Sequence, residues 1–205
     1  MGIISTAQVL VVLPGATANA ERLEALRENA LESWPEARVE VPDYLSRWRG
    51  VRGVGNWLDR WAAASLYPHD EVFLFAFILG AAALPYAPAL LGHVRRLVVL
   101  RSRYQEGVPR FLRRRFTPPL AALLFGRAVA DLGQPPFWPV GFAAAVPALT
   151  LVETRPTRLA EHLKIRPLSD AELGIDGAVE VGLDHDFAYF APSLMKTAVD
   201  WLRSG

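Results

Sequence analysis

Cysteine is absent from the chain of 205 residues. Its absence excludes disulfides, thiolate catalysis and metal sites built on cysteine ligands. An excess of charge of one sign is also missing, because 22 Lys and Arg side chains are balanced by 21 Asp and Glu side chains. A strongly basic chain would indicate a nucleic acid partner, so this balance argues against one.

Long hydrophobic runs are missing as well. No apolar run reaches the roughly 20 residues that a helix needs to cross a bilayer, which argues against a transmembrane segment. Residues 1–8 place no basic region before their apolar side chains, as a secretory signal would. We therefore expect a cytoplasmic protein.

Histidine patterns that bind metals do not occur either. His69, His93 and His162 stand apart from one another, and the chain contains neither H-x-H nor H-E-x-x-H. The sequence therefore predicts no metal site and no cofactor.

The patterns that are present predict an α/β fold. Apolar runs of strand length alternate with helical patterns, which is typical of a parallel sheet. The hydrophobic fraction of 52% suits a sheet covered on both faces. We expect one three-layer domain over residues 1–205, with a mostly parallel sheet of about six strands and helices on both faces. The predicted strands are Gln8–Leu13, Ala37–Val41, Val72–Phe77, Arg96–Leu100, Ala148–Glu153 and Ala178–Val181.

Two segments interrupt this alternation. Residues 47–55 (RWRGVRGVG) predict a glycine-rich loop, with a helix starting at Asn56. Residues 103–147 predict an insertion that begins with arginines and continues as one apolar helix from Pro119 to about Leu132. Such an insertion is either a cap over a site or an interface.

The bend at 76–80 (AFILG) is the most informative stretch. It predicts a buried strand that turns tightly at residues 78–80 into a helix beginning near Ala81, and Gly80 permits the close approach of the two. Together with the Asp-His-Asp-Phe loop at 184–187 before a final helix, this order resembles the α/β-hydrolase family over almost the whole chain. The chain would lack the first antiparallel strands of full-sized members, as compact members do.

The resemblance implies where a site would lie. In that family the bend is written G-x-S-x-G and presents a nucleophilic serine. Ile78 occupies the serine position here, and an isoleucine side chain cannot attack a substrate. The family's oxyanion hole would draw on backbone N–H groups of Leu79 and of Ala16 or Thr17, which need no particular side chain.

The resemblance also places a general base and its acid. His185 matches the family's histidine position, and Asp184 or Asp186 could orient it. The acid is expected just after the strand 148–153, but residues 154–158 contain no carboxylate, so the nearest candidate is Glu153. The histidine is thus the one catalytic position that the sequence matches directly.

Each of these residues also has a structural interpretation. His185 could be a loop residue tied to the backbone, and Ile78 could fill the space that a catalytic triad once occupied. Ser102, at the end of the strand 96–100, could attack a substrate but is the residue type of an ordinary turn.

Basic side chains cluster in the insertion. Four of them could bind carboxylates or phosphates, form a partner surface, lie on a membrane face beside the apolar helix, or form a solvated helix flank. These are Arg110, Arg113, Arg114 and Arg115. Residues 116–146 carry only Arg127 and Asp131 as charges, and this favours self-association through an apolar surface.

We therefore predict a non-catalytic α/β-hydrolase-like protein that binds a small ligand or a protein partner at the former active-site edge. The residues expected around that site are Ile78, Leu79, Ala16, His185 and Ser102. The alternative is an esterase-like hydrolase that uses a non-standard nucleophile or a water activated by His185 with Asp184 or Glu153. A structural subunit of an assembly is a third possibility.

Overall fold

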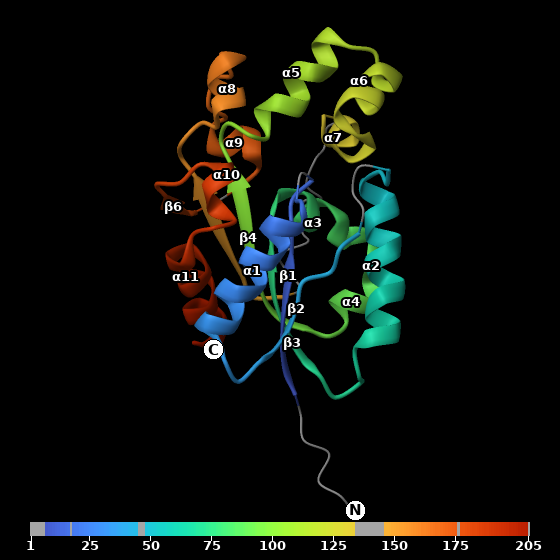
Figure 1. Cartoon of the computed structure of the whole chain (residues 1–205), viewed down its shortest axis with the longest axis vertical. Coiled ribbons are helices and arrows are strands. Elements are labelled where there is room, and N and C mark those ends of the chain that lie inside the picture. The colour runs from blue at the N-terminus through green and yellow to red at the C-terminus, as the bar shows by residue number, and fades with distance from the viewer. Residues whose placement is uncertain (1–6, 17, 45–47, 134–145, 176, 205) are drawn as a thin grey trace, which may run out of the picture.

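A computed structural model describes residues 7–16, 18–44, 48–133, 146–175 and 177–204. Its centre is a six-stranded sheet in the order β2-β1-β3-β4-β5-β6 (Figure 1). Every neighbouring pair of strands is parallel. The strands are β1 (Gln8–Leu13), β2 (Arg38–Glu40), β3 (Glu71–Ala76), β4 (Val94–Ser102), β5 (Ala148–Glu153) and β6 (Val179–Val181). The prediction of a parallel sheet of about six strands is confirmed.

Helices cover both faces of this sheet. On one face lie α2 (Val51–Ser65), α3 (Ile78–Ala83), η1 (Leu84–Tyr86) and α4 (Pro88–Leu91), which pack on alternate strand residues such as Val11 and Leu74. On the other face lie α1 (Ala20–Ser33) and α11 (Pro192–Arg203), which pack on Leu10 and Phe75. Because both faces are covered, the central strands contain buried apolar runs, such as residues 9–13 of β1 and 72–76 of β3.

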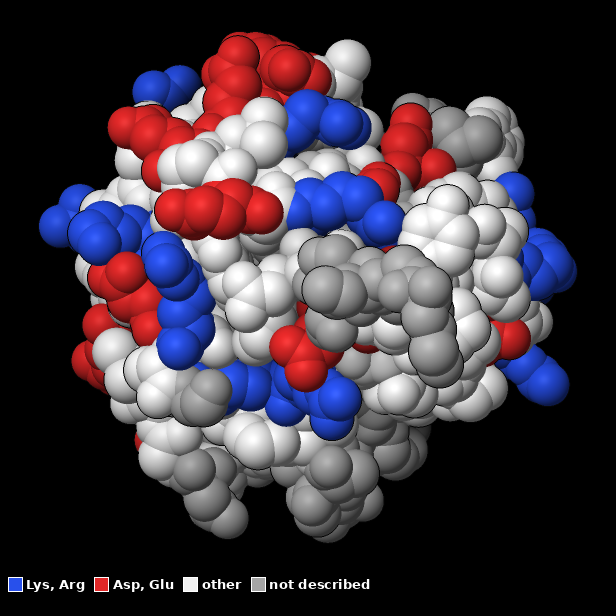
Figure 2. All heavy atoms as spheres, turned by 90° about the horizontal axis from the view of Figure 1, so that it is seen from below, with Lys and Arg blue, Asp and Glu red and all other residues white. Residues whose placement is uncertain are grey.

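The two ends of the sheet differ. At the carboxyl ends of the strands lie α5 (Gly107–Arg115), α6 (Pro118–Phe125), α7 (Arg127–Leu132), α8 (Arg158–His162), α9 (Asp170–Leu173) and α10 (His185–Ala188) (Figure 1). The opposite end, where the strands begin, exposes acidic and basic side chains interspersed with one another (Figure 2). Ligands of open α/β sheets bind at the carboxyl ends of the strands, so a site is expected at this end of the sheet.

Two local predictions were wrong at the start of a helix. The segment 47–55 is not a loop throughout, because α2 already begins at Val51 and includes Gly53 and Gly55. A Cβ on Gly55 would lie 2.5 Å from the carbonyl oxygen of Ala83, so glycine lets α2 pack closely on α3. The helix after the bend begins at Ile78 rather than near Ala81.

The single apolar helix predicted over 119–132 is two helices. Gly126, between α6 and α7, has φ +94°, a conformation that side chains rarely adopt, and it breaks the helix there. The apolar pattern continued across the glycine and concealed this break. Residues 134–145 of the predicted insertion lie outside the described residues.

Candidate active site at the carboxyl ends of the strands

A small cavity of about 50 Å³ opens at the carboxyl ends of the central strands. Loop and helix residues after β1 and β3 form its floor, namely Ala16, Ile78 and Leu79. His185 forms one side. The insertion forms the roof with Gln105, Glu106, Val108, Pro109, Val129 and Leu132. The structure thus brings together four of the five residues that the sequence placed around a site.

Ile78 is the first residue of α3 and is only 6% exposed. The preceding Phe77 is extended, with φ −72° and ψ 166°. Among the described residues other than glycine, positive φ occurs at Lys164 and not at the bend. A β-branched side chain would strain a left-handed backbone, so the relaxed bend suits an isoleucine.

Gly80 holds the bend against the first strand. A Cβ at this position would lie 2.4 Å from the Cβ of Leu13 and 2.9 Å from its carbonyl oxygen. No other residue type fits without moving α3 away from β1. The bend therefore brings Ile78 and Leu79 close to the loop that follows β1.

Glu153 and His185 form a buried pair beside this bend. Nδ1 of His185 lies 3.0 Å from Oε1 and 3.2 Å from Oε2 of Glu153. Their side chains are 5% and 0% exposed. Since Nδ1 is held by the carboxylate, Nε2 is the ring nitrogen available to a ligand in the cavity.

The surroundings of His185 favour its charged form. Burial lowers the pKa of His185, but the charge and hydrogen bond of Glu153 and the charge of Asp186 outweigh burial, so the pKa is raised above its usual value. The imidazole is therefore more often protonated near neutral pH than a free histidine.

Aromatic rings fix the position of the imidazole. Phe77 stacks on Tyr189 at 4.7 Å between ring centroids, and both rings meet His185 edge-on. The Tyr189 hydroxyl accepts a hydrogen bond of 3.0 Å from the N–H of Gly15. Burial raises the pKa of Tyr189 well above its usual range, so the hydroxyl stays neutral.

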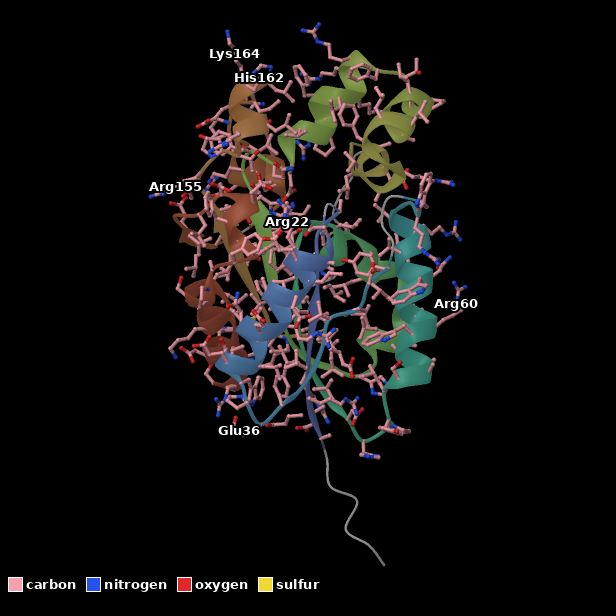
Figure 3. All side chains as sticks on the ribbon, viewed as in Figure 1. Arg22, Glu36, Arg60, Arg155, His162 and Lys164 are labelled. Atoms are coloured by element: carbon pink, nitrogen blue, oxygen red, sulfur yellow. The ribbon has the colours of Figure 1, made fainter. Side chains whose placement is uncertain are left out.

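The two aspartates that flank His185 make other contacts. Asp184 caps α10, since its Oδ1 accepts hydrogen bonds from the N–H groups of Asp186 and Phe187. Asp186 forms an ion pair of 2.6 Å with Arg22, which lies at the upper end of α1 in Figure 3. The residue that orients the imidazole in this structure is therefore Glu153.

Ser102 lies outside the cavity lining and is 1% exposed. Its Oγ accepts a hydrogen bond from the N–H of Gln105, as in an ordinary turn. Thr17, the other oxyanion candidate, lies outside the described residues.

A second buried ion pair connects the roof to the sheet. Arg101 donates from Nε and Nη2 to the two carboxylate oxygens of Glu106, each at 2.7 Å. Arg101 also donates to the carbonyl of Leu173, and Glu106 accepts from the N–H of Ser102. The sequence pattern did not indicate this pair, which joins the end of β4 to the start of α5.

The four arginines of the insertion lie away from the cavity lining. Arg110 donates to the carbonyl of Glu172 at 3.0 Å, and Arg113 donates to that of Gly133 at 3.3 Å. Arg114 and Arg115 are exposed. These side chains therefore belong to the outer surface of the roof.

A larger, open cavity of about 460 Å³ lies beside the small one and shares Ala16 and Val129 with it. Its ionisable groups are Asp43 and Tyr44, and the Tyr44 hydroxyl donates to the carbonyl of Pro14. Because it contains no acid–base pair, we place the candidate chemistry in the smaller cavity.

The described residues contain no group of three or more His, Asp or Glu side chains that could hold a metal ion. No helix among them is long and apolar enough to span a membrane.

No protein-family model matches the sequence, and no curated protein matches it either. Solved structures do. The mature lipase BlEst2 of Bacillus licheniformis is 14% identical with a TM-score of 0.63, and the match covers 97% of this chain and 92% of that one. Polyneuridine aldehyde esterase is 13% identical with a TM-score of 0.55, covering 97% of this chain and 99% of that one.

A third similar structure is the NocB thioesterase domain in covalent complex with a fluorophosphonate nocardicin G analog. It is 14% identical with a TM-score of 0.54, and the match covers 98% of this chain and 96% of that one. At these identities the comparison concerns the fold alone. The six parallel strands, the bend after β3, and the helices on both faces agree with it, and the chain has the α/β-hydrolase fold.

Proposed function

We propose that the protein binds a small molecule in the cavity between Ile78 and His185 and does not form a covalent intermediate with it. One observation carries this proposal: the side chain at the bend, where the fold would present a nucleophile, is an aliphatic one that lines the same cavity as the imidazole. An alkyl group cannot attack a carbonyl carbon, so the arrangement suits recognition rather than acyl transfer.

The cavity lining indicates the chemistry of the ligand. Because Glu153 holds Nδ1 and raises the pKa of His185, we expect Nε2–H to be the donor that His185 offers to a ligand in the cavity. A carbonyl or carboxylate oxygen would accept this hydrogen bond. Leu79, Val108 and Val129 provide apolar walls, which suit a short hydrocarbon chain next to that oxygen. The expected ligand is thus a small carboxylic acid or carbonyl compound.

A hydrolase that activates water is the second candidate, and the Glu153–His185 contact favours it. A general base must be deprotonated before it can accept a proton from water. Since the pKa of His185 is raised, the neutral base is less abundant near neutral pH. This candidate therefore predicts a hydrolysis rate that increases with pH as His185 loses its proton.

Binding of short carboxylates tests the proposal. The imidazole resonances of His185 are followed by NMR while acetate, butyrate or phenylacetate is added. We expect saturable shifts with at least one of them, and loss of binding in Ile78→Trp, which fills the cavity. Ser193→Ala on the exposed face of α11 serves as the control. Absence of any saturable shift, or equal binding by Ile78→Trp, contradicts the proposal.

A further inference from the structure

We propose that the outer surface of the roof binds an anionic lipid surface. We call this region the roof surface and define it by the exposed basic end of α5 and the exposed apolar side chains of α6. Its residues are Arg113, Arg114, Arg115, Leu120, Leu123, Leu124 and Phe125. The proposal does not depend on what the cavity below binds.

The basic half of the roof surface has no acidic counterpart in its own segment. Residues 107–130 contain five arginines and no Asp or Glu. Arg113, Arg114 and Arg115 follow one another at the end of α5, and all three are exposed. Arg113 contacts a backbone carbonyl and Arg115 lies over the ring of Phe111, so neither is neutralised by a carboxylate in these contacts.

The apolar half exposes an unusual amount of hydrocarbon. Leu123 is 74% exposed, Leu124 is 50% exposed and Leu120 is 42% exposed. Phe125, at the end of the same helix, is 39% exposed. Large apolar side chains that gather on one exposed helix usually have a partner surface.

Both halves belong to one surface. The rings of Phe116 and Phe125 are in contact at 5.9 Å between centroids, and this contact joins the end of α5 to the end of α6. Ala160 of α8 belongs to the same apolar cluster as Val108 and Leu112 of α5. Basic and apolar groups therefore lie beside each other, as in segments that bind the membrane interface.

The neighbouring segment 158–164 adds two basic side chains, Arg158 and Lys164, at this end of the molecule. His162 and Lys164 lie at the same end of the molecule as α5 (Figure 3), and Arg158 and Leu159 of α8 are also exposed. Glu161 is the exposed acid of that helix. The opposite end of the molecule instead mixes charges of both signs (Figure 2).

Charge favours a lipid surface over a second copy of the chain. A two-fold contact through α6 would bring two arginine clusters near each other with no acid from residues 107–130 between them, which is repulsive. Anionic headgroups would neutralise the arginines, while the leucines enter the boundary between headgroups and acyl chains. Self-association, expected from the sequence, becomes an outcome of the test.

The test is flotation of the full chain with vesicles of phosphatidylcholine alone or with about a third phosphatidylglycerol. We expect binding to the anionic vesicles only, weakened at high salt because the Debye length falls from about 10 Å at 0.1 M to about 3 Å at 1 M. The triple variant R113Q/R114Q/R115Q should bind about tenfold more weakly or worse. The variant L123S/L124S should also bind more weakly, because it lacks the inserted apolar groups.

The control is R27Q/R60Q/R95Q, which removes the same charge from exposed arginines of α1, α2 and β4. It should bind like the unmodified chain, and circular dichroism checks that all variants fold. Equal binding to neutral vesicles, equal loss in both triple variants, or no vesicle binding overturns the proposal. If the chain does not bind vesicles but sediments as a dimer, and L123S/L124S dissociates that dimer, the roof surface serves self-association instead.

Discussion

The imidazole Nδ1 of His185 lies 3.0 Å from Oε1 of Glu153, although the two residues are 32 positions apart in the chain. Glu153 ends β5, and His185 begins α10 just after β6, which pairs with β5. The sheet itself therefore assembles this pair. An acid–base contact thus lies beside a bend that carries isoleucine.

Replacing the acid should lower the pKa of the imidazole. In Glu153→Gln, burial would continue to lower the pKa of His185 while the charge that raises it is gone. NMR titration of the imidazole should give a lower pKa than in the unmodified protein. A control, Glu161→Gln on the surface of α8, should leave that pKa unchanged. An equal or higher pKa in Glu153→Gln would show that the carboxylate does not hold the proton on the ring.

The same pair should make stability depend on pH. Because the folded pKa of His185 is raised above its unfolded value of about 6.5, its stabilisation is fully present below that pH and disappears as pH rises through the folded pKa. Glu153→Gln should lower the free energy of unfolding by about 3 kcal/mol at pH 6 and by less at pH 9. Urea unfolding at both pH values measures the difference. A larger loss of stability at pH 9 than at pH 6 would contradict a stabilisation that depends on the protonated imidazole.

A hydroxyl at the bend should acquire reactivity. Ile78→Ser would place a hydroxyl on the cavity that His185 lines, so a fluorophosphonate probe should label it, and His185→Ala in the same chain should abolish labelling. Because Ile78 is buried, the variant should also lose about 3 kcal/mol of stability. Ile78→Val is the control and should remain unlabelled. Labelling that persists in the variant carrying both Ile78→Ser and His185→Ala would show that the imidazole does not activate the hydroxyl at the bend.

Removing one partner of the ion pair beneath the roof should lower the stability of the fold more than removing both partners. Arg101→Met leaves the buried carboxylate of Glu106 without its partner, and we expect a loss of about 3–5 kcal/mol. The double variant Arg101→Met with Glu106→Leu should recover part of this loss. A double-mutant cycle by urea unfolding measures the coupling. If the double variant is the sum of the two single variants, the pair contributes no specific coupling.

Two glycines should respond differently to alanine. Gly80→Ala places a Cβ within 2.4 Å of the Cβ of Leu13, so we expect a loss of about 2 kcal/mol or more. At Gly92 the nearest atom to an added Cβ is 3.5 Å away, and Gly92→Ala should change stability by about 0.5 kcal/mol at most. Thermal unfolding compares the two variants, and equal effects would contradict the close approach at the bend.

The order of strands and helices could be predicted from the sequence because burial on both faces gives the inner strands apolar runs, as in β1 and β3. The same composition concealed other features. The apolar pattern runs through Gly126, where a positive φ ends α6. Gly53 and Gly55 suggested a loop but lie inside α2, where Gly55 permits close packing on α3. The sequence alone does not distinguish a glycine that ends a helix from a glycine that permits a close contact within one.

The site could be predicted in part. The resemblance to the α/β-hydrolase family implied that Ile78, Leu79, Ala16 and His185 would surround a site, and they line one cavity. The sequence did not decide whether Asp184 or Glu153 is the partner of His185. The structure shows that Asp184 caps a helix and that Glu153 is the buried carboxylate at the imidazole. The insertion was expected to form a cap or an interface, but the sequence did not indicate which of its residues line the cavity, because apolar side chains that line a cavity resemble those of a core.

The central claim is that the bend offers no nucleophile while the Glu153–His185 pair persists beside it. The most direct measurement is labelling of the unmodified protein with a fluorophosphonate probe, followed by intact mass, together with hydrolysis of p-nitrophenyl acetate and butyrate. We predict no covalent adduct and no hydrolysis above that of His185→Ala. An adduct, or ester turnover that His185→Ala abolishes, would contradict the claim.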